Sequence, residues 1–570
     1  MAIQPEVLVN RGRALLPDGS ILESSVGTTI GELLATVYPH PQLPIVAAVV
    51  DNQFQDLGYR PKTDITLQPV DTSSSEGMRI YQRSLCFVLV VAMHEVYPTV
   101  RLVIDHSVPN GGFYCELVGH DPLTGQELAL VEARMRQIVT RDEPITCEML
   151  TLTEAKLAFA QQGFQDKVSL LGFTPDAAIP TYVLRGIRDS FYGIMSARTG
   201  LLRWFSLGVS ATGFILYLPQ LHKPTELPPA YEHTKIMRVF RDYGRWLNIL
   251  GIDDISSLNT VVDQNRIREV ILVDEALHEK NISDLADEIV ARKRTARVVL
   301  IAGPSSSGKT TFARRLAIQL RVSGLKPYAL GLDDYFVDRE LTPRDEQGEY
   351  DYEAFEAIDC GLFNEQLLQL LPGKIVALRK FDFNSGHGYA GKSVQLPADA
   401  ILIVEGIHGL NPGLLTDEVR AQTFRLYVSA LAQLNIDDHN RVPTTDSRLL
   451  RRIVRDAQFR GYSAQETLAR WESVRRGEER NIFPYQENAD ALFNSALVYE
   501  LAVLKPFAEP LLNKILPGSA TTREAQRLLT LLQWVRPCLP DLVPDNSLLR
   551  EFIGGSILED FSFHWPNSEG

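Results

Sequence analysis

The stretch Gly303-Pro-Ser-Ser-Ser-Gly-Lys-Thr310 decides the fold of the C-terminal half of this chain. It fits the pattern G-x-x-x-x-G-K-[ST], which is the phosphate-binding P-loop. The apolar run Val298-Val-Leu-Ile-Ala302 before it predicts a buried strand, and residues 311–320 after it predict an amphipathic helix. Because glycines let backbone N–H groups converge on phosphate oxygens at a helix N-terminus, this order predicts a nucleoside triphosphate site.

Roles within the loop follow from residue type. Lys309 can reach the β- and γ-phosphates, and the Thr310 hydroxyl can bind magnesium. A chance match in a Gly/Ser turn is the alternative, and the flanking strand and helix argue against it. We therefore expect ATP and Mg²⁺ as cofactors. The residues expected to bind ATP are Gly303, Ser305, Ser306, Ser307, Gly308, Lys309, Thr310 and Thr311.

The composition sets the broad class of the protein. A chain of 570 residues is too long for one core, so several domains are expected. The net charge of −14 argues against a protein that coats nucleic acid. The five cysteines form no CxxC pair, which disfavours a disulfide framework or a cysteine zinc site. The N-terminus has no signal pattern, and the longest apolar stretch, 85–93, is too short to span a bilayer. We expect a cytoplasmic protein without membrane contact.

Pattern changes along the chain predict a multidomain α+β and α/β protein. A polar linker at 71–77 and a proline-rich linker at 219–229 separate the first segments. A buried helix is expected at 84–97 and a hairpin at 201–218. The expected segments are short strands and turns at 1–70, mixed helices and strands at 78–220, a helical connector at 233–296, a parallel sheet with helices on both faces at 297–515, and a mostly helical tail at 516–570.

Two further apolar strands end in carboxylates. The strand predicted at 326–332 runs into Asp333 and Asp334, and the strand at 400–404 runs into Glu405. Substrates bind at the carboxyl edge of an open α/β sheet, so Asp333 can accept a proton from an attacking hydroxyl. Glu405 takes the Walker-B position, which holds magnesium directly or through water. Solvated strand-end acids are the alternative. His408, close by, is at least as well explained as a packed histidine.

Ten arginines lie between residues 441 and 480. Arg448, Arg452 and Arg455 share one helical face by their i, i+4 and i+3 spacing. Arginines aimed at a transferring phosphate stabilise its developing charge. A solvated charged face or an RNA-binding face is the alternative, and the interleaved Asp and Glu residues disfavour RNA.

Taken together, residues 297–505 resemble the uridine kinase and phosphoribulokinase family. The motifs that carry the resemblance follow the P-loop in order: Asp333-Asp-Tyr-Phe336, Tyr350-Asp-Tyr352, Glu356-Ala-Ile-Asp359, Phe381-Asp-Phe-Asn-Ser-Gly-His387, Val404-Glu-Gly406 and the run from Asp446 to Asp456. The resemblance implies a kinase fold in which Asp333 and Lys309 are catalytic and Glu405 and Thr310 bind Mg²⁺. It also implies substrate contacts from Phe336, Asp359, Phe381, His387 and Arg452, and lid arginines at Arg455 and Arg460.

Three positions depart from the family pattern. Phe381 replaces a base-contacting tyrosine, Arg470 replaces a substrate-contacting glutamine, and Tyr462 replaces a lid arginine. His387 lies one residue from the family's base-contacting histidine. We include Phe381 and Arg470 among the expected acceptor contacts. The departures support phosphoryl transfer and weaken the assignment of uridine as the acceptor.

The N-terminal half resembles two modules of threonyl-tRNA synthetases. Residues 1–70 resemble a TGS domain, which is a small β-grasp module. Residues 78–220 resemble the second additional domain, most clearly at Pro109-Asn-Gly-Gly-Phe-Tyr-Cys-Glu116. That domain edits mischarged tRNA with a His-x-x-x-His pair, whose places are taken here by Arg83 and Phe87. Its later cysteine and histidine are missing from the stretch 189–196. We therefore predict no editing and no zinc; regulation, RNA contact and a structural scaffold remain open.

The layout as a whole resembles a bacterial group of nucleoside kinases. The leading hypothesis is ATP-dependent phosphorylation of the 5′-hydroxyl of a uridine- or cytidine-like nucleoside. A kinase of a sugar phosphate or a pantothenate-like acceptor is the second hypothesis. The third is an RNA- or ribosome-associated regulator that uses ATP as a switch.

Overall fold

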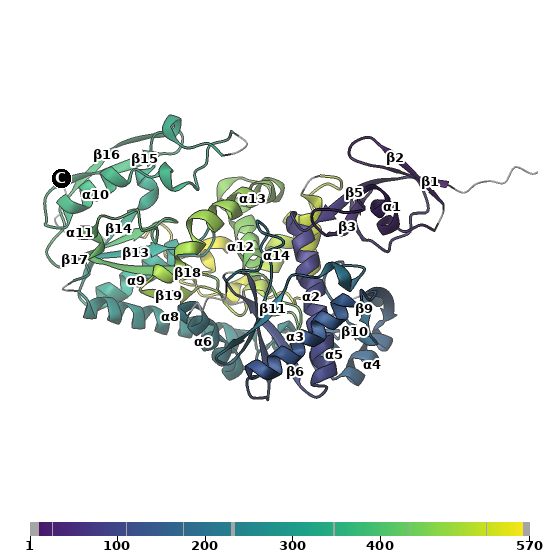
Figure 1. Ribbon diagram of the computed structural model, residues 1–570. Coiled ribbons are helices and arrows are strands. Elements are labelled where there is room, and N and C mark those ends of the chain that lie inside the picture. Colours follow the sequence, from purple (N-terminus) through teal and green to yellow (C-terminus); the bar gives the residue numbers. More distant parts are fainter. Residues whose placement is uncertain are drawn as a thin grey trace, which may run out of the picture. The chain divides into compact units, whose positions relative to one another are not determined.

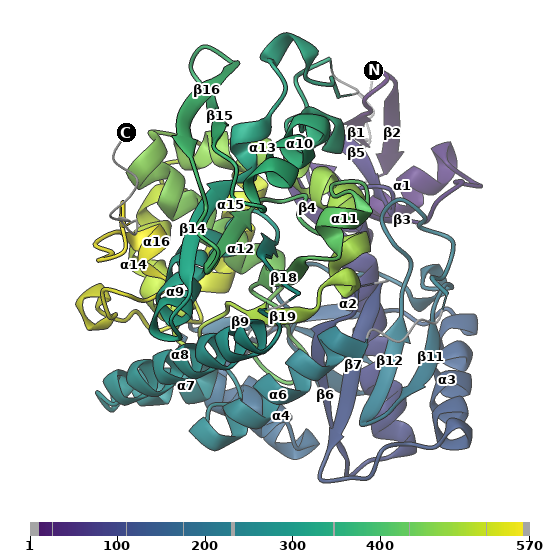
Figure 2. The ribbon, with the colours of Figure 1, turned by 90° about the vertical axis from the view of Figure 1, so that its left-hand side faces the viewer.

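The computed structural model describes residues 11–25, 27–109, 111–174, 176–229, 234–293, 295–345, 348–431, 434–519 and 521–561. The chain forms two compact units, whose elements are labelled in Figure 1 and seen from a second side in Figure 2. The first unit holds the described residues up to 229 together with 254–256 and 434–442. The second unit holds the other described residues, which include the expected tail and the expected connector apart from 254–256. The five-segment division stays a prediction.

The N-terminal part of the first unit is a five-stranded sheet with one helix. The strand order is β2-β1-β5-β3-β4, with β1 and β5 parallel and the other pairs antiparallel. Thr29 begins α1 with a capping box, in which the Glu32 carboxylate accepts from the Thr29 N–H at 2.8 Å. The T-x-x-E pattern therefore fixes the start of this helix. The elements are β1 (Arg11–Leu15), β2 (Ile21–Ser25), α1 (Ile30–Val37), β3 (Ile45–Val50), β4 (Gln53–Asp56) and β5 (Ile65–Asp71).

The helix α2 (Ser75–Val96) forms the centre of the rest of the first unit. The polar linker predicted at 71–77 is wrong, because the Ser74 hydroxyl accepts from the Gly77 N–H at 3.1 Å and starts the helix there. Side chains from 84 to 93 are buried in a core shared with β3, β6 and β7. The predicted hairpin at 201–218 is present as β11 and β12. The other elements are β6 (Arg101–Ser107), β7 (Gly112–Val118), α3 (Gly125–Thr140), β8 (Thr146–Thr151), α4 (Leu152–Gln162), α5 (Gln165–Leu170), β9 (Ala178–Leu184), β10 (Ile187–Asp189), β11 (Ser206–Ser210) and β12 (Gly213–Tyr217).

The second unit is built on a parallel sheet of order β14-β17-β13-β18-β19. The helix α9 (Lys309–Val322) packs against one face, and α10 (Cys360–Leu370) joins the apolar core on the other (Figure 1). Because β13, β14 and β17 are adjacent and parallel, their carboxyl ends meet at one edge. The strands are β13 (Val298–Ala302), β14 (Lys326–Gly331), β17 (Ala400–Glu405), β18 (Thr423–Ser429) and β19 (Ala491–Asn494).

Further helices and a hairpin surround this sheet. The tail is less helical than expected, because Pro537, Pro540 and Pro544 interrupt the chain between α15 and the one-turn α16. None of the described helices combines the length and the apolar character that a membrane crossing requires. The remaining elements are α6 (Thr234–Leu250), α7 (Ile255–Asp263), α8 (Ile267–Ala291), β15 (Val376–Asp382), β16 (His387–Val394), α11 (Asp417–Arg420), α12 (Thr444–Arg455), α13 (Ala464–Asn481), α14 (Glu500–Leu512), α15 (Thr522–Leu532) and α16 (Arg550–Ile553).

A buried carboxyl group on α8 connects that helix to the turn before α14. The side chain of Asp274 is fully buried, and its Oδ2 accepts from the Val498 N–H at 2.8 Å. Burial raises the pKa of Asp274 to about 8, so the folded protein holds this carboxyl in its protonated form at neutral pH. The stability that the protonated Asp274 contributes to the folded protein is complete below the ordinary pKa of 3.8. This contribution is lost as the pH rises through about 8.

Replacing Asp274 with Asn should raise stability at alkaline pH. The amide keeps an oxygen for the Val498 N–H and needs no proton, so the thermal midpoint of the variant should exceed that of the wild type by about 3 °C or more at pH 8, and by much less at pH 5. Thermal melts across this pH range measure the difference. A gap that stays constant with pH would contradict the assignment.

Candidate functional site

The backbone of residues 303–308 forms a tight loop after β13. A Cβ on Gly303 would overlap the carbonyl oxygen of Val428, so this position requires glycine. Ser306 and Gly308 adopt left-handed conformations with φ of 57° and 84°. The hydroxyls of Ser306 and Ser307 are buried and make no hydrogen bond among the described residues. The loop thus keeps polar groups available in its interior.

Lys309 begins α9 and folds back over the loop. Its ammonium donates to the carbonyl oxygens of Gly303 and Pro304, both at 2.9 Å. Desolvation lowers the pKa of Lys309, and the nearby carboxylates of Glu405, Glu551 and Asp333 oppose that effect. The ammonium therefore lies among acidic side chains at the carboxyl edge of the sheet.

Thr310 and Glu405 face each other across this edge. The Thr310 hydroxyl lies 3.1 Å from both carboxylate oxygens of Glu405. Burial raises the pKa of Glu405 to about 7; Lys309 opposes this rise, while Glu551 and Asp333 add to it. Hard oxygen donors are the ligands that Mg²⁺ prefers, and Mg²⁺ usually keeps several waters and takes only one or two carboxylates. This pair of residues therefore fits a magnesium ion.

The two acids after β14 have different surroundings. Asp334 is ion-paired with Lys380 of β15 at 2.6 Å. Asp333 reaches solvent and makes no hydrogen bond or ion pair within the described part of the chain. Desolvation by the surrounding protein raises the pKa of Asp333, with Lys309 opposing it and Asp334 adding to it. Of the two, Asp333 is the carboxylate open to an incoming hydroxyl.

A buried ion pair that we did not predict supports the loop. Arg448 of α12 binds Glu478 of α13 through two contacts, at 2.5 and 2.8 Å, and both side chains are almost fully buried. The Glu478 carboxylate also accepts from the Ser305 N–H at 3.0 Å, and Arg448 donates to the Ser305 carbonyl oxygen at 3.1 Å. The pair thereby holds the loop backbone at Ser305, through both the N–H and the carbonyl oxygen of that residue.

Three predicted arginines gather around one buried acid. Arg452, Arg455 and Arg460 lie 3.4, 2.8 and 3.7 Å from the carboxylate of Asp456. Arg452 also donates to the Ser305 hydroxyl at 2.8 Å. Only Arg452 of the three is in contact with the loop; Arg455 and Arg460 are held beside it at Asp456.

The predicted acceptor contacts have different surroundings. Phe336 and Phe381 lie together, with ring centroids 5.8 Å apart, and Phe383 is 5.1 Å from Phe381. Asp359 caps α10 by accepting from the Leu362 N–H at 2.9 Å, so one of its oxygens has a structural role. His387 is exposed at the start of β16, and its Nδ1 lies 3.4 Å from Asp338.

Arg470 points to a different partner. Its guanidinium lies 4.4 Å from the ring centre of Tyr462, so two of the three departures from the family pattern contact each other. Arg470 precedes Glu478 by eight residues on α13, which is about 12 Å along the helix axis. No described contact brings Arg470 to the P-loop.

Two further acids near the loop were missed by the sequence analysis. Glu551, on α16 in the tail, accepts from the Thr311 N–H at 3.0 Å, and Leu548 fills the space where a Cβ on Gly308 would lie. Burial raises the pKa of Glu353 to about 7, with Glu478 adding to the rise and Arg452 and Lys309 opposing it. Tail residues some 240 positions away carry no local signal that would place them at the loop.

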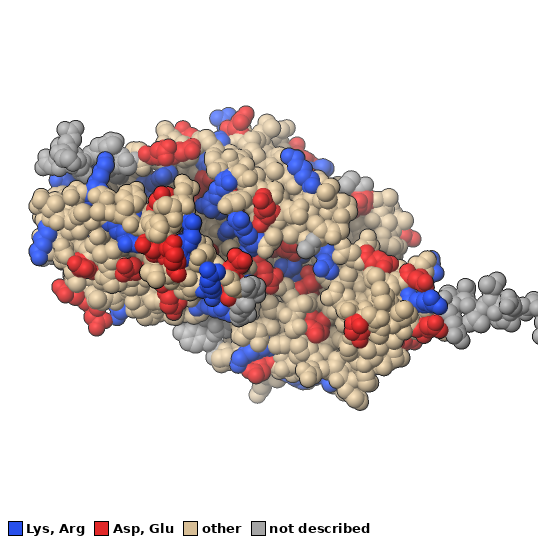
Figure 3. Space-filling view, turned by 90° about the horizontal axis from the view of Figure 1, so that it is seen from above, with Lys and Arg blue, Asp and Glu red and all other residues tan. Residues whose placement is uncertain are grey.

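On the face shown in Figure 3, basic and acidic side chains are interspersed, and no continuous basic surface covers it.

Comparisons with known proteins match the two halves of the chain separately. Residues 298–502 match the model of the phosphoribulokinase / uridine kinase family. The N-terminal part is similar to threonine–tRNA ligases, with 32% identity to the enzyme of Symbiobacterium thermophilum and 28% to that of Burkholderia multivorans, over 193 residues in each case. Each match covers 34% of this chain and 30% of the ligase. The chain thus spans less than a third of the length of these curated relatives.

Solved structures also resemble parts of the chain. A possible uridine kinase from Bacillus stearothermophilus is 22% identical, covers 38% of this chain and 98% of its own, and has a TM-score of 0.26. The D-glycerate 3-kinase from Cryptococcus neoformans is 14% identical, covers 48% and 87%, and has a TM-score of 0.20. The parallel sheet, the P-loop at the end of β13 and the family match agree with one another: residues 298–502 form a P-loop kinase domain of the phosphoribulokinase / uridine kinase family.

Proposed function

We propose that this domain transfers the γ-phosphoryl group of ATP to the 5′-hydroxyl of a nucleoside. The observation that carries the proposal is the meeting of Lys309, Asp333 and Glu405 at the carboxyl edge of one parallel sheet, where Lys309 acts electrostatically on both acids. That edge is where open α/β sheets bind substrates. The family match makes phosphoryl transfer the chemistry to expect there.

Each residue has a defined part in the transfer. Lys309 and the loop N–H groups hold the phosphates, and Asp333 accepts the proton of the attacking hydroxyl. Thr310 and Glu405 would hold Mg²⁺, which when bound offsets the negative charge of the phosphates. Arg452, Arg455 and Arg460, gathered at Asp456, supply positive charge beside the loop. Closure of these arginines over the triphosphate would exclude water and limit hydrolysis.

The acceptor side favours a neutral ring compound. Phe336, Phe381 and Phe383 form an aromatic cluster, and the exposed rings of Phe383 and Tyr352 can stack on a base. The cations of β15 are already engaged: Lys380 pairs with Asp334, and Arg379 donates to the Phe336 carbonyl oxygen at 2.8 Å. A sugar-phosphate acceptor would need unengaged cations here, so a nucleoside fits better.

Replacing Asp333 with Asn should abolish transfer and leave ATP binding largely intact. The amide cannot take the hydroxyl proton, whereas Lys309 and the loop backbone remain; we expect turnover to fall by about 10²–10⁴-fold. Coupled ADP release across a panel of nucleosides, sugar phosphates and pantothenate measures turnover, and calorimetry measures ATP binding.

The panel also decides the acceptor. Acceptor-dependent turnover with pyrimidine nucleosides supports the proposal, and turnover with a sugar phosphate alone would replace it. Folded wild-type protein that binds ATP but shows no turnover with any member of the panel would contradict a kinase role.

Replacing Glu551 with Gln should tighten ATP binding. The Glu551 carboxylate occupies the Thr311 N–H in the first turn of α9, where an anion competes with and repels the triphosphate. We expect the Kd to fall by about three- to tenfold, measured with a fluorescent ATP analogue. Glu559→Gln removes an exposed acid of the same tail and is the matched control. An unchanged or higher Kd for Glu551→Gln would show that Glu551 does not compete with ATP.

A further inference from the structure

One short segment of the kinase-domain sequence belongs to the first unit. Residues 434–442, which we call the arm, lie in the chain between β18 and α12, yet they pack with residues 1–229 in one compact unit. Their sequence is Leu434-Asn-Ile-Asp-Asp-His-Asn-Arg-Val442, and all of these residues except Arg441 are buried. Four consecutive polar residues, 437–440, are therefore buried, which requires specific partners.

Backbone contacts attach the arm to the first unit. The Ile104 N–H of β6 donates to the Asp438 carbonyl oxygen at 2.8 Å, and the Asn435 side chain donates to the Asp105 carbonyl oxygen at 2.9 Å. The Ile255 N–H, in the other short segment of this unit, donates to the Asn435 carbonyl oxygen at 2.9 Å. The arm thus takes up backbone groups of β6 that would otherwise need water or another partner.

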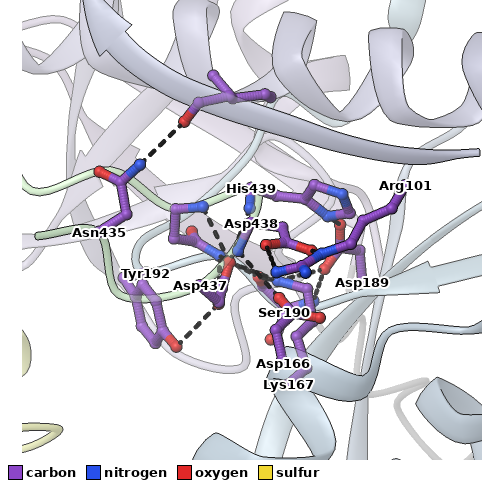
Figure 4. Close-up of polar contacts among 12 residues, drawn as sticks. Arg101, Asp166, Lys167, Asp189, Ser190, Tyr192, Asn435, Asp437, Asp438 and His439 are labelled. Carbon is purple, nitrogen blue, oxygen red and sulfur yellow. Dashed lines mark hydrogen bonds and ion pairs between the residues drawn. The ribbon is translucent and has the colours of Figure 1, made fainter. Parts of the chain in front are cut away.

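Buried charged side chains of the arm contact buried charged side chains of residues 78–220, as Figure 4 shows. The Lys167 ammonium lies 2.9 Å from Asp189 and 2.8 Å from Asp437 of the arm, and all three side chains are at most 1% exposed. His439 of the arm binds the other oxygen of Asp189 at 2.7 Å. Burial alone would lower the pKa of His439, but Asp189 outweighs it and raises that pKa overall. The arm therefore completes a cluster of two acids and two basic groups.

A second ion pair lies at the edge of the arm. Arg101 of β6 binds Asp438 through two contacts, at 2.6 and 2.7 Å, and the Arg101 side chain is 46% exposed. Removing one partner of a buried pair, such as Lys167 with Asp437, strongly destabilises the folded protein. Arg101 is the exposed partner of its pair, so changing it carries less risk to folding than changing Lys167.

The arm contacts the stretch in which the editing residues were found to be missing. Asn440 donates to the Ser190 carbonyl oxygen at 2.9 Å, and the Tyr192 hydroxyl lies 3.4 Å from Asp437. Ser190 and Tyr192 belong to the stretch 189–196. The stretch that the sequence analysis aligned with the editing residues of the synthetases is therefore a contact surface for the arm.

The arm continues directly into α12. Only Pro443 separates Val442 from the first residue of that helix, Thr444. One turn later the helix carries Arg448, which holds Ser305, and then Arg452, which donates to the Ser305 hydroxyl. A restraint on the arm is therefore a restraint on the start of the helix that supports the P-loop.

We propose that residues 78–220 act as a receptor for the arm, that this docking restrains the N-terminal end of α12, and that the restraint affects the affinity of the P-loop for nucleotide. The effect on the arm and on α12 stands on the contacts above; only the effect on affinity rests on the proposed function.

A charge exchange in the full-length chain tests this inference. Arg101→Glu and Asp438→Arg should each speed hydrogen exchange of the α12 amides, 444–455, by about fivefold or more and raise the Kd for ATP by about threefold, because each breaks the pair. The double variant Arg101→Glu/Asp438→Arg should recover at least half of both effects, because it restores opposite charges. Arg198→Glu, which breaks the exposed pair of Arg198 with Asp142 in the same unit, is the matched control and should change neither.

The two readouts separate this inference from the proposed function. Faster exchange in α12 with unchanged ATP affinity would support the receptor and overturn the link to the P-loop. Unchanged exchange in α12, or a uniform rise across the whole chain, would overturn the receptor role. Asp438→Asn is a milder second variant, which should give smaller effects in the same direction if the charge-reversed chains fail to fold.

Discussion

The arrangement around the P-loop depends on the buried ion pair between Arg448 and Glu478. Both ends of this pair reach Ser305, one through its N–H and the other through its carbonyl oxygen. A buried pair of this kind contributes little net stability compared with apolar packing, but losing one partner costs about 3–5 kcal/mol. Its main effect is therefore on geometry, because it links α12, α13 and the loop at Ser305.

The helix α12 is held at several points along its length. Asp446 in its first turn binds Arg527 of the tail, and Arg451 is buried against Glu500 of α14. The chain before it is the arm, which the first unit holds by Lys167 and Arg101. The tail also reaches the P-loop directly through Glu551. The tail, which carries no recognisable catalytic motif, thus contacts both the loop and the helix that supports it.

Local patterns predicted much of the kinase domain. The P-loop, the strands at 298–302, 326–332 and 400–404, and the acids that end two of them were all visible, because strand periodicity and strand-end carboxylates are short-range features. The roles given to Asp333 and Glu405 remain predictions. The start of α2 could not be predicted because Ser74 lies in a polar run typical of a linker, and the tail holds less helix than expected because its prolines interrupt it.

The sequence by itself determined the fold class, the phosphate-binding loop and the absence of familiar editing residues, because each depends on residue type at fixed spacing. Only the tertiary structure decided that Glu478 and Glu551 bind loop amides, that Arg470 lies on Tyr462, and that residues 434–442 belong with the first unit. These are pairings between buried polar groups distant in the chain. Such groups must find partners, but which partner each finds depends on the whole packed arrangement.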